Sequence, residues 1–199
     1  MSLDPKLGKS KRMSGLDYTV DLEFTPNPNS LKYVTRPDLM ERGAVTFARA
    51  EDAVGKSTLA EKLFAIEGIS AVMVGKNFVT ITLSNHNKLT EINDRVIDTV
   101  KAALQSGEKV VSDDALGNRN SVANSDIEKQ IVEILDAEIR PAVAMDGGDI
   151  TFEKYQDGIV FLHMQGACAG CPSSTATLKM GIENRLREKI PEIVEVVAV

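Results

Sequence analysis

The chain has 199 residues, 43% of them hydrophobic and 26% charged, which is typical of a soluble globular protein with one large or two small domains. No apolar run approaches the ~20 residues that a membrane-spanning helix needs, so we expect no membrane segment. The net charge of −6 arises in residues 121–199, which carry 7 Lys and Arg against 13 Asp and Glu, and this acidic region excludes the basic surface that nucleic-acid binding needs.

A first α+β domain is predicted over residues 17–105, after a flexible leader at residues 1–16. Alternating apolar and polar residues predict two strands on either side of a turn at Pro26–Asn29. A short amphipathic helix then ends at Gly68, and two strands joined by the Gly75–Asn77 turn form a hairpin. Apolar residues at near-3.6 spacing, from residue 89 to residue 104, predict a final helix.

The segment Ala53–Thr58, AVGKST, ends like a phosphate-binding loop but does not complete the pattern. The full pattern needs a glycine five residues before Gly55, and that position is Ala50. The surrounding domain also shows no parallel βαβ pattern. We therefore interpret the segment as the start of a helix with Ser57 as its N-cap.

A linker is predicted over residues 106–124, which are rich in Ser, Asn, Asp and Gly and show no apolar period. The second domain is predicted over residues 125–199. Ser125 and Glu128 form a capping box at the start of an amphipathic helix, and this helix should weaken near Pro141.

Two strands follow the tight turn at Asp146–Asp149, and the Gln156–Gly158 turn joins them into a hairpin. A helix then begins near Pro172 and stops at Pro191, and a last strand ends the chain. The second domain is thus predicted as α-β-β-α-β, with helices packed on a three-stranded mixed sheet. The predicted fold class of the chain is α+β in two small domains.

Cys168 and Cys171 are the only cysteines, and they form a CxxC pair between the last hairpin and the following helix. This spacing serves a dithiol redox couple, half of a zinc site or half of an iron–sulfur site. Two cysteines three residues apart do not form a disulfide framework, so a reducing compartment is expected. The start of a helix is expected to favour the thiolate, as all three chemistries require.

The number of ligands separates these chemistries further. Structural zinc sites and [4Fe–4S] clusters take four protein ligands, and one chain supplies two thiolates. The only histidines are His86, in the other domain, and His163, on a strand where it could face outward. A two-fold dimer could bring four cysteines around one metal centre. Such a centre would be exposed and easily released, which suits a carrier.

The residues around the pair fit a redox dithiol less well. Thioredoxin-like motifs usually have an aromatic residue before the first cysteine and often a proline between the two, whereas this chain has Ala167 before the pair and Ala169-Gly170 within it. A thiol–disulfide oxidoreductase that uses Cys168 and Cys171 is kept as the alternative function. A structural zinc module shared by two chains is a third.

Two stretches of the chain resemble a known family. DGGDI and the later GACAGCPSSTATLKMGIENRLREKIPEI resemble the C-terminal domain of NifU-type iron–sulfur scaffold proteins. TPNPNSLKYV and LAEKLFAIEGISAVMVGKNFVTIT resemble the N-terminal domain of Nfu proteins. The resemblance implies that Cys168 and Cys171 bind a [4Fe–4S] cluster shared between two subunits of a homodimer, and that the chain is a carrier and not an enzyme.

The implied partners are apo iron–sulfur client proteins, which receive the cluster, and an upstream cluster assembly scaffold. The N-terminal domain has no cysteine and would bind clients or partners. Gly166, Ala167, Ala169 and Gly170 would let the backbone donate N–H bonds to sulfide, and residues 172–175 would open a helix that offsets the charge of the cluster.

The leader does not match the presequence of mitochondrial relatives, which is rich in Arg and Ser and poor in acidic residues, because Asp4 and Asp17 interrupt it. The expected location is therefore the bacterial cytoplasm, or the mitochondrial matrix if the N-terminus has been trimmed.

Overall fold

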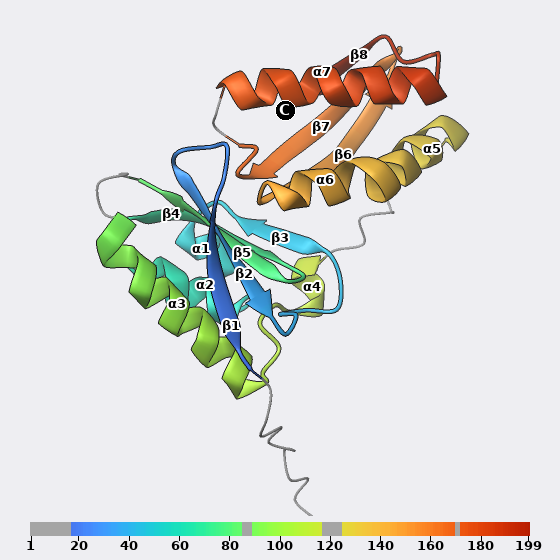
Figure 1. Cartoon of the computed structure of the whole chain (residues 1–199). Coiled ribbons are helices and arrows are strands. Elements are labelled where there is room, and N and C mark those ends of the chain that lie inside the picture. Colours follow the sequence, from blue (N-terminus) through green and yellow to red (C-terminus); the bar gives the residue numbers. More distant parts are fainter. Residues whose placement is uncertain (1–16, 85–88, 117–124, 170–171) are drawn as a thin grey trace, which may run out of the picture.

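Two β-sheets with separate buried cores organise the chain, as the computed structural model shows (Figure 1). The structure describes residues 17–84, 89–116, 125–169 and 172–199. We call the described residues up to 116 the N-terminal part and those from 125 onward the C-terminal part. Both parts combine helices and strands, which confirms the predicted α+β class.

The first sheet is antiparallel, with its strands in the order β1-β2-β5-β4-β3. These strands are β1 (Thr19–Phe24), β2 (Ser30–Arg36), β3 (Ala44–Phe47), β4 (Ile69–Gly75) and β5 (Phe78–Leu83). The pairs β1–β2 and β4–β5 match the strands predicted from alternation and turns. β3 was not predicted, because four residues are too few to establish a period, and pairing with β4 stabilises it at the edge of the sheet.

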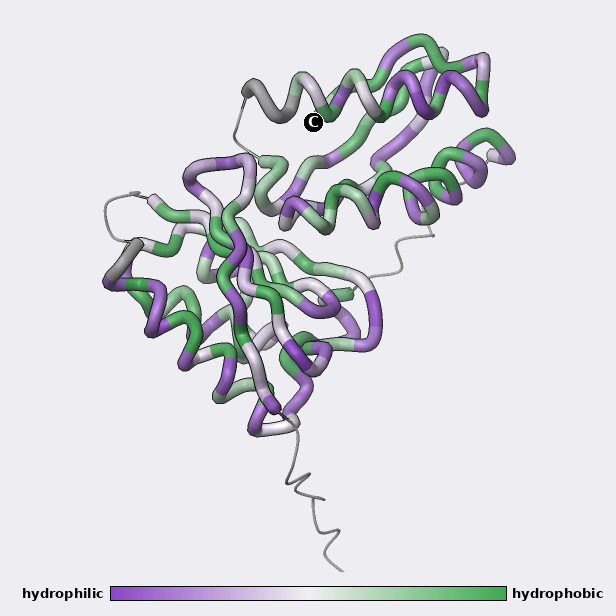
Figure 2. Tube along the Cα trace, in the orientation of Figure 1, coloured by the Kyte–Doolittle hydropathy of each residue, from purple (hydrophilic) through white to green (hydrophobic). Residues whose placement is uncertain are grey.

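Helices cover one face of the first sheet. The helices of the N-terminal part are α1 (Ala50–Ala53), α2 (Thr58–Phe64), α3 (Leu89–Ser106) and α4 (Asp113–Leu116). Leu63 of α2 and Val96 of α3 are fully buried in the same core as Tyr33 of β2. Along α3, hydrophobic and hydrophilic residues alternate at helical spacing (Figure 2), as the sequence predicted.

The other face of the first sheet is also covered, because the C-terminal part lies against it (Figure 1). Phe78 and Thr80 of β5 point away from α2 and α3, yet both are buried. The hydroxyl of Thr80 donates to the carbonyl of Gly147, at 2.8 Å. A threonine on this face therefore has a specific partner from the other sheet.

Ser57 is the N-cap of α2, which confirms the interpretation of the AVGKST segment as a helix start. Its Oγ accepts a hydrogen bond from the backbone N–H of Ala60 at 3.1 Å and donates one to the carbonyl of Val110 at 2.7 Å. Val110 and Val111 are buried in the first core, although the sequence placed both in the linker. The segment before residue 117 therefore packs against the N-terminal part, and residues 117–124 lie outside the described residues, as does the predicted leader.

The second sheet has the order β6-β7-β8, with β6 (Gly148–Gln156), β7 (Ile159–Gly166) and β8 (Glu195–Ala198). β6 and β7 are antiparallel, whereas β7 and β8 are parallel and are joined through α7 (Pro172–Lys189). The predicted three-stranded mixed sheet is thus confirmed. Apolar side chains of the helices and of all three strands form one core, so the helices cover a single face.

The helix before the second sheet is continuous through Pro141. It consists of α5 (Asp126–Ile134), the π-helix η2 (Leu135–Ile139) and α6 (Arg140–Met145). The capping box of Ser125 and Glu128 is present as predicted. Pro141 has no N–H to donate, and the wider π turn lies directly before it, with Arg140 N–H bonded to Leu135 O. The expected weakening near Pro141 is therefore a change of helix type, and the helix ends only at Met145.

None of the helices in the described ranges combines the length and the apolar character that crossing a bilayer would require.

We predict that Ser57→Ala lowers the free energy of unfolding by about 1 to 2 kcal/mol, because it removes both the N-cap and the bond to Val110. Urea unfolding followed by circular dichroism measures the change. Ser70→Ala, at an exposed serine of β4, is the matched control and should stay within about 0.5 kcal/mol of the parent chain. Equal effects of the two substitutions would contradict the assignment.

Candidate functional site

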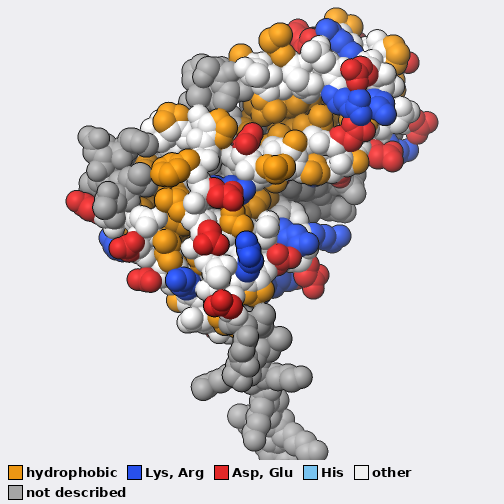
Figure 3. Space-filling model, in the orientation of Figure 1, with side chains coloured by type: hydrophobic (Ala, Val, Ile, Leu, Met, Phe, Trp, Pro, Cys, Tyr) orange, Lys and Arg blue, Asp and Glu red, His pale blue; other side chains and the backbone are white. Residues whose placement is uncertain are grey.

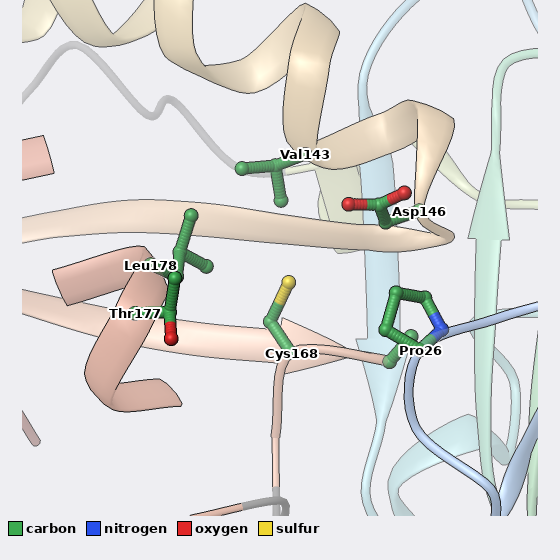
Figure 4. A pocket seen from close by; sticks show the side chains of 7 residues that line it. Pro26, Val143, Asp146, Cys168, Thr177 and Leu178 are labelled. Carbon is green, nitrogen blue, oxygen red and sulfur yellow. The ribbon is translucent and has the colours of Figure 1, made fainter. Parts of the chain in front are cut away.

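Cys168 lies in the short segment between β7 and α7, at the boundary with the N-terminal part (Figure 4). Cys168 is 7% exposed, and Ala167 is 3% exposed. Cys171 and Gly170 lie outside the described residues, as do the side chains of residues 172–175. The structure therefore locates one thiol of the predicted pair and the strand and helix that flank it.

Gly148 makes room for the sulfur of Cys168. A Cβ at position 148 would lie 2.3 Å from Cys168 Sγ, closer than any side chain can approach. Gly148 is the first residue of β6 and pairs with Gly166 at the end of β7. The second glycine of the DGGD turn is thus needed where β6 passes the thiol.

Gly166 turns the chain from β7 into the cysteine segment. Its φ of +63° is in the left-handed region, and a Cβ there would lie 2.4 Å from Met73 Sδ and 2.6 Å from Gly147 O. Met73 belongs to β4 of the N-terminal part. The glycine before the cysteines therefore permits both the turn and the close approach of the first sheet.

The backbone N–H groups next to Cys168 are already bonded within the C-terminal part. Ala167 N–H donates to Gly147 O and Ala169 N–H donates to Gly166 O, both at 3.1 Å. In this conformation both N–H groups have backbone partners, and their donation to sulfide stays a prediction. A tight buried turn satisfies its own N–H groups first, since leaving them unpaired is costly.

Burial also dominates the acidity of the thiol. Burial, followed by the negative charges of Asp146 and Asp149, raises the pKa of Cys168 to about 11. The sequence predicted the opposite, a thiolate favoured by the start of α7. Removal of the sulfur from water is the largest cause of this rise, because a buried anion loses its solvation.

A cavity of about 470 Å³ opens beside the thiol. In Figure 4, Cys168 lies between Leu178 of α7 and Pro26 of the β1–β2 turn, and Val143 of α6 lies above it. Hydrophobic side chains reach the surface in the space between α6 and α7 (Figure 3). The cavity wall therefore combines both helices of the C-terminal part with a turn of the N-terminal part.

Asn27 brings that turn into direct contact with the cysteine segment. Its Nδ2 donates to Ala167 O at 3.2 Å and to Ala169 O at 3.0 Å, one residue on each side of Cys168. The sequence indicated only a turn at Pro26–Asn29, and nothing in its local pattern showed a partner 140 residues away.

His163 does not take part in the site. It is exposed on β7, with Nε2 3.0 Å from Glu153 Oε2 and Nδ1 3.0 Å from Val199 O, as its predicted outward orientation requires. His86 lies outside the described residues. Within the part of the chain that the structure describes, no three His, Cys, Asp or Glu side chains gather closely enough to hold a metal ion.

Comparison with protein families matches both parts of the chain. Residues 131–197 match the NifU-like domain, and residues 20–107 match the N-terminal domain of the scaffold protein Nfu/NifU. One solved structure that matches, a NifU-like protein from Saccharomyces cerevisiae, is 22% identical and covers 57% of this chain and 99% of its own, with a TM-score of 0.42.

Several relatives match over most of this chain. The NFU1 iron-sulfur cluster scaffold homolog, mitochondrial, of Homo sapiens is 37% identical over 176 residues, which cover 87% of this chain and 69% of the relative. The protein of the same description from Drosophila virilis is 38% identical, over 94% of this chain and 62% of the relative. NifU-like protein 4, mitochondrial, of Arabidopsis thaliana is 37% identical, over 87% of this chain and 63% of the relative. The chain thus spans between 62% and 69% of the length of these relatives.

We predict that Gly148→Ala lowers the free energy of unfolding of the C-terminal part by about 1 to 3 kcal/mol, because the new methyl group must displace the thiol of Cys168. Gly181→Ala is the matched control. Gly181 is exposed in the middle of α7 with nothing within 4 Å of an added Cβ, so this change should raise stability by up to about 1 kcal/mol. Thermal unfolding compares the two, and a neutral Gly148→Ala would refute the close approach.

Proposed function

The chain belongs to the family of NifU-like and Nfu iron–sulfur cluster scaffold proteins, and from that premise we propose that two copies of it share one [4Fe–4S] cluster and deliver it to apo-proteins. The ligands in this proposal are Cys168 and Cys171 of each chain. The cluster is the cargo of the protein, so its release is part of the function.

The cysteine count is the observation that carries the proposal. A [4Fe–4S] cluster takes four thiolates, and the chain contains two. The histidine of the C-terminal part, His163, is held by Glu153 and the carbonyl of Val199 on the exposed side of β7. A two-fold axis that passes beside the cysteine segment would supply the two missing thiolates from a second copy.

The start of α7 supports the binding of an anionic cluster. α7 is 18 residues long and begins at Pro172, directly after the CxxC segment. The backbone N–H groups of its first turn and its dipole favour negative charge at this end. Cys168 loses its proton when it binds iron, because the thiolate is the ligand.

The comparisons give no support to the alternative function, a thiol–disulfide oxidoreductase, because the relatives are described as scaffolds. The burial of Cys168 and its pKa of about 11 do not separate the two functions, because thiol–disulfide exchange and iron binding both use an accessible thiolate. We therefore propose a role in binding and transfer without catalysis.

Apo iron–sulfur client proteins and an upstream assembly scaffold are the partners that follow from the proposal. The N-terminal part would contribute recognition, since it contains no cysteine. For the location, the word mitochondrial in the descriptions of the relatives supports the mitochondrial option, and the bacterial cytoplasm stays a prediction.

We predict that Cys168→Ser and Cys171→Ser each abolish the visible absorbance of the cluster after anaerobic reconstitution, whereas His163→Ala retains it. The parent chain should bind one cluster per two chains and double in mass as it loads. Mössbauer spectroscopy and native mass spectrometry measure both properties on one sample. A monomer that holds a complete four-iron cluster would overturn the proposal.

A further inference from the structure

The face of the first sheet that lies opposite α2 and α3 packs directly on the cysteine region. Ala44, Met73 and Phe78 of the N-terminal part form a buried apolar cluster, and Ala144 of α6 packs against it. Met73 also packs closely against Gly166, on the side where any other residue would carry its Cβ. The two parts therefore meet through apolar contacts at the base of the cysteine segment.

Side-chain donors surround this apolar cluster, and each of them binds a backbone carbonyl of the C-terminal part. Asn27 binds the carbonyls of Ala167 and Ala169, and Thr80 binds that of Gly147. Lys32 Nζ donates to Met145 O at 2.9 Å and is also 2.8 Å from Glu23 Oε2. The donors come from the N-terminal part, and the acceptors lie in the cysteine segment, in the turn before β6 and at the end of α6.

This arrangement conflicts with the sharing of a cluster between two chains. Asn27 holds the residue before Cys168 and the residue after it, and Pro26 forms part of the cavity wall beside the thiol. Cys168 is only 7% exposed in this arrangement. A thiolate that binds a shared cluster must face a second copy of the chain, so the segment has to be released from this position first.

We propose that this face of the N-terminal sheet is a cap that docks on the chain's own cysteine segment and must be released before two chains share a cluster. We call the bonds of Asn27, Thr80 and Lys32 the latch of this cap. The interface consists of a few apolar contacts and hydrogen bonds to carbonyls, and interfaces of this kind within one chain readily open. The inference rests on the proposed function, because it is the shared cluster that requires an open segment.

Asn27→Asp tests the latch with little change of shape. Asp keeps the oxygen that accepts the backbone N–H of Asn29 at 3.0 Å, and it replaces the amide that faces two carbonyls with a second acceptor. We expect Cys168 of the apo chain to be alkylated by iodoacetamide about tenfold faster, since the alkylation rate follows the open population. Peptide mass spectrometry at a fixed pH measures the rate at Cys168.

Asn29→Asp is the matched control, because it makes the same change of charge at an exposed position of the same turn. Cys168 of this variant should be alkylated at the same rate as in the parent chain. Thr80→Val is an independent test of the latch, since it removes the bond to Gly147 O while preserving the size of the side chain. Circular dichroism confirms that each variant is folded.

Unchanged or slower alkylation in both Asn27→Asp and Thr80→Val would overturn the cap. Anaerobic reconstitution then tests its purpose. The two variants should load a cluster faster than the parent chain and reach the same final iron content. Equal or slower loading would show that the contact does not hinder cluster binding, and would overturn the proposal.

The two proposals fail in different ways. If the parent chain binds no shared cluster at all, the proposed function fails, while the alkylation rates still decide whether the cap exists. If the parent chain binds a shared cluster and the variants alkylate at its rate, the function stands and the cap fails.

Discussion

The contact between the sulfur of Cys168 and the backbone at Gly148 organises the region on which the function depends. Because no side chain fits at position 148, β6 passes directly against the thiol, and the turn before it reaches the first sheet through Thr80. Gly166 allows the same close approach from β7. Two glycines thus bring together two strands, the cysteine segment and a sheet from the other part of the chain.

This packing places two requirements on one thiol. In the proposed function Cys168 binds iron as a thiolate that is open to a second chain, whereas the structure holds it buried, with a raised pKa. A carrier benefits from both states at different times, since a buried thiol is protected from oxidation and an open one can bind the cluster. In the proposed cap, the hydrogen bonds of Asn27 to Ala167 and Ala169 would let the N-terminal part shift the balance between them.

Local patterns predicted most of the fold correctly. Alternation predicted β1 and β2, and turn residues predicted the hairpins β4–β5 and β6–β7. The capping residues Ser57 and Ser125 marked the starts of α2 and α5. The errors have local causes too. β3 is too short to show a period, and the two buried valines at 110 and 111 lie in a segment whose composition resembles a linker. At Pro141 a π turn accommodates the missing N–H, so the helix continues.

The sequence by itself determined that the chain brings two thiolates in one CxxC pair, and therefore that a four-ligand centre needs a second copy or another ligand. Residue identity and spacing are sufficient for that conclusion, because it is a matter of counting. Only the tertiary structure decided that Asn27 reaches the carbonyls beside Cys168, and that burial raises the pKa of this thiol. Both depend on how sheets from distant parts of the chain pack together, and that packing leaves no periodic signal in the sequence.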